Sequence, residues 1–300
     1  MTEFSRRRFL KYSSAFMATT AMSAVIPFRS ARAASWDRLR ASGTGKRVFI
    51  TGSTSGIGLV AAEQLIQQGH RVVAHARNPQ RARELKTALA GAEHIVIGDL
   101  SNMQQIKEMA KELNQLGHFD AVIQNAGTYA SGSREAVAGN IPYIFMVNTL
   151  APYMLTALME RPERIIFVSS SYHRGANIDI TDITWNRRPW SGYQAYGCSK
   201  FYDALLANTL ARYWPERFIN TIRPGWVPTH MGGAGAPDDL EDGAFTQSWL
   251  AVSDEPAAHV SGKFFFHMQE ERADPRLSDP QLQDQFIRAC ESLTQLQLPS

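Results

Sequence analysis

The sequence has only two cysteines in 300 residues, Cys198 and Cys290. That number excludes a disulfide framework. The chain also has no Cys-x-x-Cys pair, no His-Glu-x-x-His motif and no Cys/His cluster, so we expect no metal site. A single bridge between the two cysteines is the alternative, and it is disfavoured because Cys198 falls in a segment expected to be a functional helix.

Long unbroken apolar runs are also absent. Residues 12–28 are mildly apolar, but serines and threonines interrupt them and Pro27 stops the run, so we expect no stable membrane anchor. This stretch follows Ser5-Arg6-Arg7-Arg8-Phe9-Leu10-Lys11 and precedes Ala31-Arg32-Ala33. A basic region, an apolar region and a small-residue cleavage site in this order are typical of a removable twin-arginine signal.

We therefore predict a twin-arginine signal peptide over residues 1–33, a linker over 34–45 and a single domain over 46–300. The mature protein is then expected in the periplasm; a cytoplasmic protein with a basic surface helix is the alternative. The formal net charge of +3 comes from this leader, which has six basic residues and one acid. The rest of the chain is slightly acidic, so no nucleic-acid partner is expected.

From residue 47 onward, short apolar strands alternate with helices. Regular alternation of this kind predicts an α/β fold, with a Rossmann-type doubly wound parallel sheet and helices on both faces. The strands are expected at 47–51, 71–76, 94–97, 121–124, 164–169, 218–223 and 263–267. The helices are expected at 57–68, from Pro79 onward, at 102–116, within 141–159, at 195–213 and at 280–298, the last covering either an oligomer interface or the sheet edge.

Three glycines follow the first predicted strand, in Thr51-Gly52-Ser53-Thr54-Ser55-Gly56-Ile57-Gly58. A helix is expected to begin here, and its unpaired N–H groups and dipole would favour an anion. Glycine allows close approach of a phosphate to the backbone, or supplies a positive φ. The spacing differs from Gly-x-Gly-x-x-Gly, so an ordinary βα turn is the alternative to a dinucleotide site.

No acid ends the second predicted strand, where a carboxylate would hold the adenosine ribose of NAD. Arg77 stands there instead and suits the 2′-phosphate of NADP. We therefore predict NADP as the cofactor, with NAD as the alternative; Arg77 could otherwise be a solvated residue. Asp99, followed by Leu100, ends the third strand and would face the adenine amino group or cap the next helix.

Ser170, Tyr196 and Lys200 form the candidate catalytic group. Tyr196 and Lys200 lie one turn apart on one face of the predicted helix. A tyrosine is ordinarily a poor base at neutral pH, and a neighbouring ammonium favours its phenolate form. Tyr196 could then exchange a proton with a substrate oxygen while Ser170 steadies that oxygen. An amphipathic helix with a surface lysine and a serine-rich loop is the alternative.

Six motifs stand in the order and approximate spacing of the short-chain dehydrogenase/reductase family. They are residues 51–58, Gln124-Asn125-Ala126-Gly127, Asn148, residues 166–170, Tyr196 with Lys200, and Arg223-Pro224-Gly225-x-Val227-x-Thr229. The chain resembles this family over about residues 46–268. It looks like the retinol-dehydrogenase-like branch, because residues 171–195 form an insertion between Ser170 and Tyr196.

The resemblance implies a catalytic tetrad of Asn148, Ser170, Tyr196 and Lys200. In it, Lys200 would also bind the nicotinamide ribose, Asn148 would hold a water of a proton relay, and Thr229 would hold the carboxamide. The residues then expected to bind the cofactor are Gly52, Ser53, Ser55, Gly56, Ile57, Gly58, Arg77, Asp99, Leu100, Asn125, Ala126, Gly127, Tyr196, Lys200, Pro224, Gly225, Val227 and Thr229. The same resemblance implies a homodimer or homotetramer.

Two departures from the family pattern bear on the site. Gln124 replaces the usual asparagine, which should alter a strand contact more than the chemistry. Ser170 is chosen from three adjacent serines, so Ser169 and Ser171 are the alternatives. The insertion is aromatic, and with Tyr129 and the loop 231–237 it would form a substrate wall and a lid, or else pack onto the domain or an oligomer partner. His173 and His230 are expected to be satisfied or solvent-facing.

The sequence thus predicts an NAD(P)(H)-dependent oxidoreductase that interconverts a small-molecule carbonyl and an alcohol, with an apolar or aromatic substrate. The alternative is a catalytically silent NADP-binding sensor or scaffold. A sensor would need only the glycine turn, so the full set of Asn148, Ser170, Tyr196 and Lys200 favours the enzyme.

Overall fold

The computed structural model describes residues 45–129 and 132–299. The predicted signal peptide and nearly all of the predicted linker lie outside these residues. Export to the periplasm, and the oligomeric state, stay predictions. Within the described part of the chain, no helix is long and apolar enough to cross a membrane.

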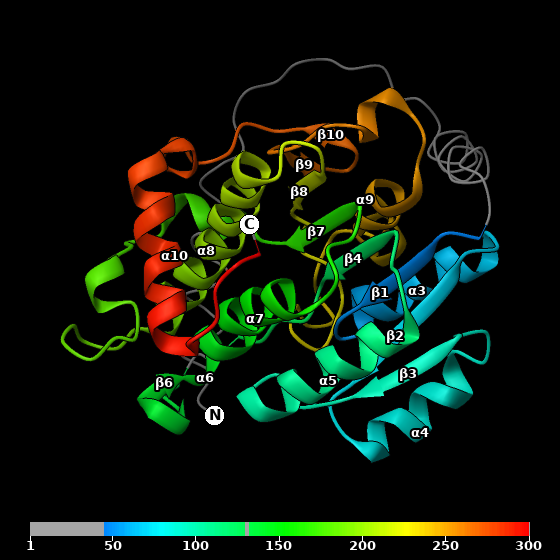
Figure 1. The fold of residues 1–300 in the computed structure, drawn as a ribbon, viewed down its shortest axis with the longest axis horizontal. Coiled ribbons are helices and arrows are strands. Elements are labelled where there is room, and N and C mark those ends of the chain that lie inside the picture. Colours follow the sequence, from blue (N-terminus) through cyan, green and yellow to red (C-terminus); the bar gives the residue numbers. More distant parts are fainter. Residues whose placement is uncertain (1–44, 130–131, 300) are drawn as a thin grey trace. The chain divides into compact units, whose positions relative to one another are not determined.

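Eight strands form one sheet in the order β10-β9-β8-β7-β4-β1-β2-β3 (Figure 1). Neighbouring strands are parallel except for β10, which runs antiparallel to β9. Their bounds are β1 Arg47–Ile50, β2 Arg71–Ala76, β3 His94–Ile97, β4 Ala121–Gln124, β7 Arg164–Val168, β8 Phe218–Ile222, β9 Phe264–Phe266 and β10 Gln269–Glu270. The predicted doubly wound parallel sheet is confirmed.

The order of strand addition reverses between β1 and β4. The chain builds outward from β1 through β2 to β3, and then crosses to β4 on the other side of β1, with Val48 beside Ala121. Ligands of such sheets bind at this switch point, beyond the carboxyl ends of the strands. The predicted glycine turn lies directly after β1, at this point.

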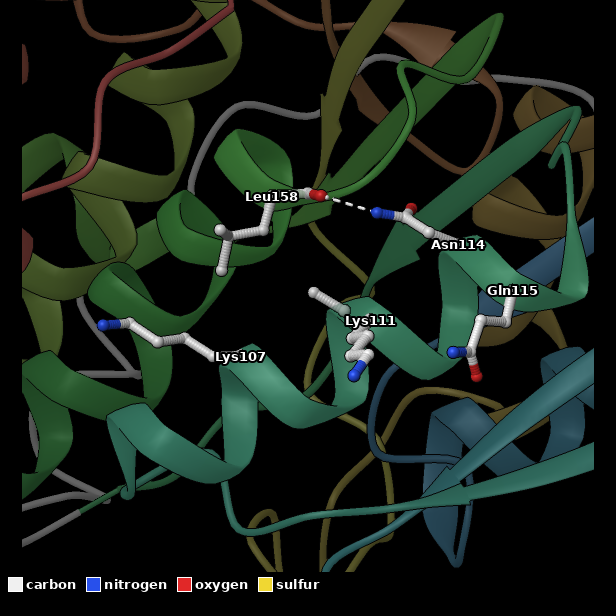
Figure 2. A pocket seen from close by; sticks show the side chains of 6 residues that line it. Lys107, Lys111, Asn114, Gln115 and Leu158 are labelled. Atoms are coloured by element: carbon white, nitrogen blue, oxygen red, sulfur yellow. Dashed lines mark hydrogen bonds between the residues drawn. The ribbon is translucent and has the colours of Figure 1, made fainter.

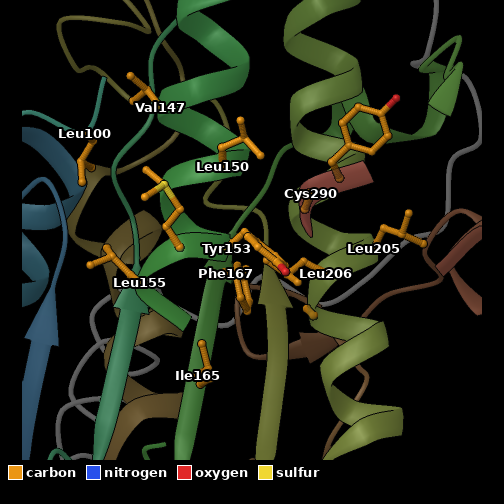
Figure 3. Packing of buried hydrophobic residues seen from close by; sticks show 14 of the residues in the cluster. Leu100, Val147, Leu150, Tyr153, Leu155, Ile165, Phe167, Leu205, Leu206 and Cys290 are labelled. Atoms are coloured by element: carbon orange, nitrogen blue, oxygen red, sulfur yellow. The ribbon is translucent and has the colours of Figure 1, made fainter. Parts of the chain in front are cut away.

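Helices cover both faces of the sheet. α3 (Gly56–Gln67) and α9 (Leu240–Val252) pack side by side over one apolar cluster, which α4 (Pro79–Ala88) extends. α5 (Met103–Leu116), α7 (Ala151–Leu158) and α8 (Gly192–Tyr213) cover the other. There, residues such as Leu150, Tyr153 and Phe167 pack together, as Figure 3 shows. A small antiparallel pair, β5 (Ala136–Val137) and β6 (Ile141–Pro142), stands apart.

The helix ends follow the sequence signals. Asn78 caps α4, with Pro79 in its first turn, and Asn102 caps α5 by accepting from two backbone amides. Gly117 takes φ +92° just after α5. α9, which was not among the expected helices, begins after Asp239, whose side chain caps it by accepting from the amides of Glu241 and Asp242.

The single long helix predicted within 141–159 is wrong in detail. The segment consists of the short α6 (Tyr143–Phe145), a π-helical turn η3 (Met146–Leu150) and α7. A π turn inserts one extra residue per turn and rotates the side chains relative to a regular helix. Local periodicity carries no signal for that insertion. Asn148 lies in the middle of it.

α10 (Pro280–Thr294) packs on α8, with Phe286 stacked on Tyr202 at 5.3 Å between ring centroids. It therefore covers a helix, where the sequence analysis allowed an interface or the sheet edge. Both cysteines are free and buried.

A groove of about 380 Å³ lies between α5 and α7 (Figure 2). Lys107, Lys111 and Gln115 line it, and Asn114 donates to the Leu158 carbonyl at 2.8 Å beside it. Asn114 and Leu158 stand near the ends of their helices, which run back from the carboxyl edge of the sheet. The groove is therefore remote from the switch point.

Candidate active site

The glycine turn is built so that β1, the start of α3 and the end of β4 meet closely. A Cβ on Gly58 would lie 2.5 Å from the Gly52 carbonyl oxygen and 2.4 Å from Asn125 Nδ2. A Cβ on Gly52 would lie 2.9 Å from the Ala126 Cα, and Gly52 has φ +69°. Side chains at either position would force these segments apart, which explains the glycines.

Thr51 connects the turn to β4. Its hydroxyl accepts from the amides of Asn125 and Ala126, both at 2.9 Å, while the Asn125 side chain donates to the Thr51 carbonyl at 2.9 Å. The predicted cofactor residues Asn125 and Ala126 therefore hold the turn in shape. Gly127, one residue further, is exposed at the edge of the site.

The start of α3 is open to a ligand. Ser55 is exposed and its side chain makes no capping hydrogen bond with the first turn of the helix, and Ile57 follows half-buried. Uncapped amides at a helix N-terminus fit a phosphate group. These residues thus fit the diphosphate of a dinucleotide.

Ser53 has a different place from the one predicted. It is fully buried, its hydroxyl donates to the Ile50 carbonyl at 2.6 Å, and its amide donates to the His75 carbonyl. Its polar groups are thus engaged inside the turn, so Ser53 supports the turn from behind.

His75 is a second support that the sequence analysis missed. Its Nδ1 accepts from the Gly52 amide at 3.0 Å, and its Nε2 lies 2.8 Å from the Gly98 carbonyl. Burial lowers the pKa of His75, so the ring is neutral, with the proton on Nε2. The only signal in the sequence was a histidine in an otherwise apolar buried strand.

The residues predicted to bind the adenosine end of the cofactor differ in how open they are to a ligand. Arg77 is exposed at the end of β2, and Arg81 nearby donates to the carbonyl and hydroxyl of Thr54 in the turn. The Asp99 carboxylate accepts from the amide and hydroxyl of Ser101, so it shapes the loop before α5. Leu100 is buried in the core.

The loop after β8 closes on the glycine turn. A Cβ on Gly56 would lie 3.1 Å from Thr229 Cγ2, and the Thr229 hydroxyl accepts from the Gly232 amide at 3.0 Å. Pro224 and Val227 are buried beneath the loop. Gly225 has φ +93° and lies against Asp238, which accepts from the Trp226 amide. The structure thus joins Gly56 and Thr229, which are 173 residues apart in the sequence.

Asn148 is fully buried in the π turn. Its Oδ1 accepts from the Thr128 amide at 2.7 Å, and its Nδ2 donates to the Thr128 carbonyl and to the Ser199 hydroxyl, both at 2.9 Å. It therefore ties the segment after β4 to α8. Ser199 in turn donates to the Tyr196 carbonyl at 2.8 Å.

Lys200 lies beneath this segment. Its Nζ donates to the Val168 carbonyl at 2.8 Å and to Asp203 Oδ2 at 2.9 Å. A Cβ on Gly127 would lie 3.3 Å from Nζ and 3.7 Å from Asn148 Oδ1. The absence of a side chain at Gly127 thus lets the lysine and the asparagine reach the same region.

Among the three adjacent serines, Ser170 suits the predicted role. Ser169 is buried and donates to the Lys200 carbonyl at 2.6 Å, and Ser171 is exposed. Ser170 is half-buried, and its hydroxyl accepts from the Tyr172 amide at 3.4 Å. Its hydroxyl proton is thus left for another acceptor.

Tyr196 is half-buried and surrounded by tyrosines. Its ring centroid is 5.1 Å from that of Tyr129 and 5.8 Å from that of Tyr172, and Tyr193 packs on Tyr172 at 5.1 Å. Burial raises the pKa of Tyr172 to about 12 and also raises that of Tyr129. These neighbours therefore stay neutral and supply aromatic surface.

The aromatic residues of the insertion form two groups. Tyr172 contacts Tyr196, and Tyr193 contacts Tyr172, so both lie beside the predicted acid/base, and a substrate wall there stays a prediction. Trp185 is buried, contacts Trp190 at 5.4 Å and lies under the Arg188 guanidinium at 3.6 Å. Trp190 donates to the Gly132 carbonyl at 2.9 Å. The tryptophans therefore pack the insertion onto the domain.

The two histidines lie where the sequence analysis expected them. His173 is buried, donates from Nδ1 to the Ser170 carbonyl and stacks on Phe264, and burial lowers its pKa. His230 is exposed. Among the described residues, no group of three His, Cys, Asp or Glu side chains could hold a metal ion.

A doubly wound parallel sheet with an open glycine turn at its switch point defines a Rossmann-type domain. Lys200, one helical turn after Tyr196, lies beside Gly127 in the segment that follows β4. The sequence pattern of the short chain dehydrogenase family matches residues 46–239. The chain belongs to the short-chain dehydrogenase/reductase family of oxidoreductases.

Known relatives agree with this assignment. The chain is 39% identical over 257 residues to the short-chain dehydrogenase chyC of Penicillium rubens, covering 85% of this chain and 99% of that protein. It is 27% identical to human retinol dehydrogenase 13, covering 85% and 86%. A Mycobacterium paratuberculosis crystal structure matches the fold with a TM-score of 0.75 at 23% identity, over 87% of this chain and 98% of that one. The NADP complex of Pseudomonas aeruginosa RhlG matches with a TM-score of 0.59 at 22% identity, over 75% and 95%.

Proposed function

We propose that this protein is an NADP(H)-dependent oxidoreductase that interconverts a carbonyl and an alcohol, with Tyr196 as the acid/base. The observation that carries the proposal is the meeting of Lys200 and Asn148 at Gly127, with Asn148 linked through Ser199 to the backbone of Tyr196.

The fit to a dinucleotide rests on features of this chain. The uncapped start of α3 and the close-packed glycines would hold the diphosphate, and exposed Arg77 would bind a 2′-phosphate. Thr229, held against Gly56, would bind at the nicotinamide end. The RhlG structure, which holds NADP, supports the choice of cofactor. When bound, the nicotinamide would donate or accept a hydride.

The residues of the chain supply the proton chemistry. In carbonyl reduction, the Tyr196 hydroxyl would donate its proton to the oxygen that becomes the alcohol, and Ser170 would donate a hydrogen bond to the same oxygen. The Lys200 ammonium stabilises the phenolate left behind. Asn148 holds the segment around Thr128 against α8, which fixes the position of that segment relative to Tyr196 and Lys200.

The substrate is proposed to be apolar or aromatic. Tyr129 and Tyr193 are 39% and 51% exposed, so aromatic surface faces outward beside Tyr196. Aromatic rings pack favourably edge-to-face on such side chains. A flat ketone would therefore gain contact area as its carbonyl approaches the phenol.

The test is turnover of Tyr196→Phe with NADPH and a panel of aryl and alkyl ketones and aldehydes. We expect kcat/KM to fall by roughly 10²-fold or more, because the proton donor is lost, while NADPH affinity is kept. Tyr213→Phe, at the far end of the same helix, is the matched control and should retain activity. NADPH binding without turnover of any carbonyl in the wild type would favour the sensor, and full activity of Tyr196→Phe would refute the mechanism.

A further inference from the structure

We propose that Asp203 is a positioning residue of the same site, which holds the Lys200 ammonium and sets the pH at which Tyr196 gives up its proton. The proposal rests on the function proposed above, because it assigns Asp203 a role through Lys200 and Tyr196.

The three residues share one face of α8. Lys200 follows Tyr196 by four residues and Asp203 follows Lys200 by three, so the three side chains project in nearly the same direction. The order along that face is phenol, ammonium, carboxylate. The Lys200 ammonium therefore lies between two groups, the Tyr196 phenol and the Asp203 carboxyl, and it attracts the ionised form of each.

The pair is sealed from water. The side chains of Lys200 and Asp203 are 5% and 4% exposed, and their Nζ and Oδ2 atoms are 2.9 Å apart. A second N–H of the ammonium goes to the Val168 carbonyl, which leaves one for the site. Asp203 Oδ1 is buried, and no hydrogen-bond partner is found for it among the described residues. A half-satisfied buried carboxylate is costly, so stability alone is a poor explanation for it.

The charge states of the pair follow from burial and pairing. Burial raises the pKa of the Asp203 carboxyl to about 6, against the opposing pull of Lys200. Burial also disfavours the charged lysine, but the Asp203 carboxylate outweighs it and raises the pKa of Lys200. Above about pH 6 the pair is therefore an ammonium with a carboxylate.

The titratable side chains named below, on elements packed against this part of α8, are neutral, stacked or paired. Arg188 of the insertion pairs with Asp182. Tyr129, after β4, and Tyr172, on η4 (Ser171–Gly175), contact Tyr196 and stay neutral. His173 of η4 is bonded to Ser170 and stacked on Phe264. From η7 (Pro275–Ser278), Arg276 lies over Phe201 and pairs with Asp274, and from α10 Cys290 is buried with a raised pKa.

With its charge present, Asp203 offsets part of the attraction that Lys200 exerts on a phenolate. The carboxylate lies seven residues beyond Tyr196, or about 10 Å along the helix. A unit charge at that distance, at an effective dielectric constant of about 20, changes a proton equilibrium by about one pH unit. While Lys200 stays protonated, removing the charge should therefore let Tyr196 ionise about one unit lower.

The experiment compares Asp203→Asn with the wild type. Asparagine keeps an oxygen for Lys200 and removes only the charge. The pH dependence of kcat/KM for alcohol oxidation should move down by about one unit. The second readout needs neither substrate nor cofactor: ultraviolet titration of tyrosine ionisation, with the same curve for Tyr196→Phe subtracted, should show one phenol moving down by the same amount.

Asp120→Asn is the matched control. Asp120 accepts from the Arg47 amide at the opposite edge of the sheet, and its loss should move neither curve. If Asp203→Asn does not fold, Asp203→Ser makes the same test. Unchanged pH profiles and phenol titrations, or failure of both variants to fold, would overturn the proposal. Absence of turnover in the wild type would instead refute the proposed function, and the phenol titration would still decide the role of Asp203.

Discussion

The approach of Gly58 to the turn offers the most direct test of the site geometry. In Gly58→Ala, the new Cβ would lie 2.5 Å from the Gly52 carbonyl oxygen, which is backbone and cannot rotate away. It would also lie 2.4 Å from Asn125 Nδ2, the donor to the Thr51 carbonyl. The turn, α3 and the end of β4 must therefore move apart.

The magnitude follows from three effects. Overpacking costs about 1–3 kcal/mol, and loss of the Asn125 hydrogen bond costs about 0.5–1.5 kcal/mol. Alanine regains up to about 1 kcal/mol, because it favours a helix over glycine. The net loss in the free energy of unfolding is about 0.5–4.5 kcal/mol, or about 1–18 °C in Tm for a domain of this size.

The assay is thermal unfolding combined with fluorescence titration of NADPH. We expect Gly58→Ala to lose the stability given above and to bind NADPH at least tenfold more weakly, because the displaced amides no longer face the phosphates. Gly235→Ala is the control, since nothing lies within 4 Å of its added Cβ and its φ is not positive. A variant with wild-type Tm and wild-type NADPH affinity would refute the close-packed turn as the basis of the site.

Two further predictions concern the cofactor end. Arg77→Ala should weaken NADPH binding about 10- to 100-fold, because it removes a charged hydrogen bond to the 2′-phosphate, and should leave NADH binding unchanged. Arg83→Ala is the control, since Arg83 is exposed on α4. Equal losses of affinity for both cofactors in Arg77→Ala would argue against a phosphate contact. Burial holds the pKa of His75 below its unfolded value of 6.5, so the stability it contributes is complete above about pH 6.5 and is lost as pH falls. Thermal unfolding between about pH 5 and 7 should show a smaller loss in His75→Gln than in the wild type, and parallel curves would contradict the neutral bridge to Gly52.

Much of the fold was predictable because its signals are local. Strands β2, β3 and β4 have the predicted bounds, since short apolar runs between turn residues specify them. The helix expected from Pro79 onward begins there, with Asn78 as its cap. The helix expected from residue 102 begins one residue later, with Asn102 as its cap. The predicted strand 263–267 corresponds to β9, but the antiparallel β10 was not predicted, because the chain reverses at His267 and Met268, which both have positive φ, without a glycine to mark the turn.

The candidate site was predictable only where its parts share a helix or a turn. Tyr196 and Lys200 lie one turn apart in any helix, and the three glycines follow one strand, so their grouping needs no knowledge of the rest of the chain. Thr229 against Gly56, and Gly127 beside Lys200, depend on where the crossovers place separate strands. The inward direction of Ser53 depends on the neighbouring strand β2.

The sequence by itself determined the alternation of strands and helices, the glycine turn and the phenol–ammonium pair, because each is a repeat or spacing within a few residues. Tertiary structure alone decided that His75 supports the turn, that Asn148 sits in a π turn facing Ser199, and that the pair of Lys200 and Asp203 is buried. The physical reason is that burial and hydrogen-bond partners depend on chain segments dozens of residues away. Spacing in the sequence specifies which side chains share a face of a helix. Packing of distant segments specifies which charges and hydrogen-bond partners surround those side chains.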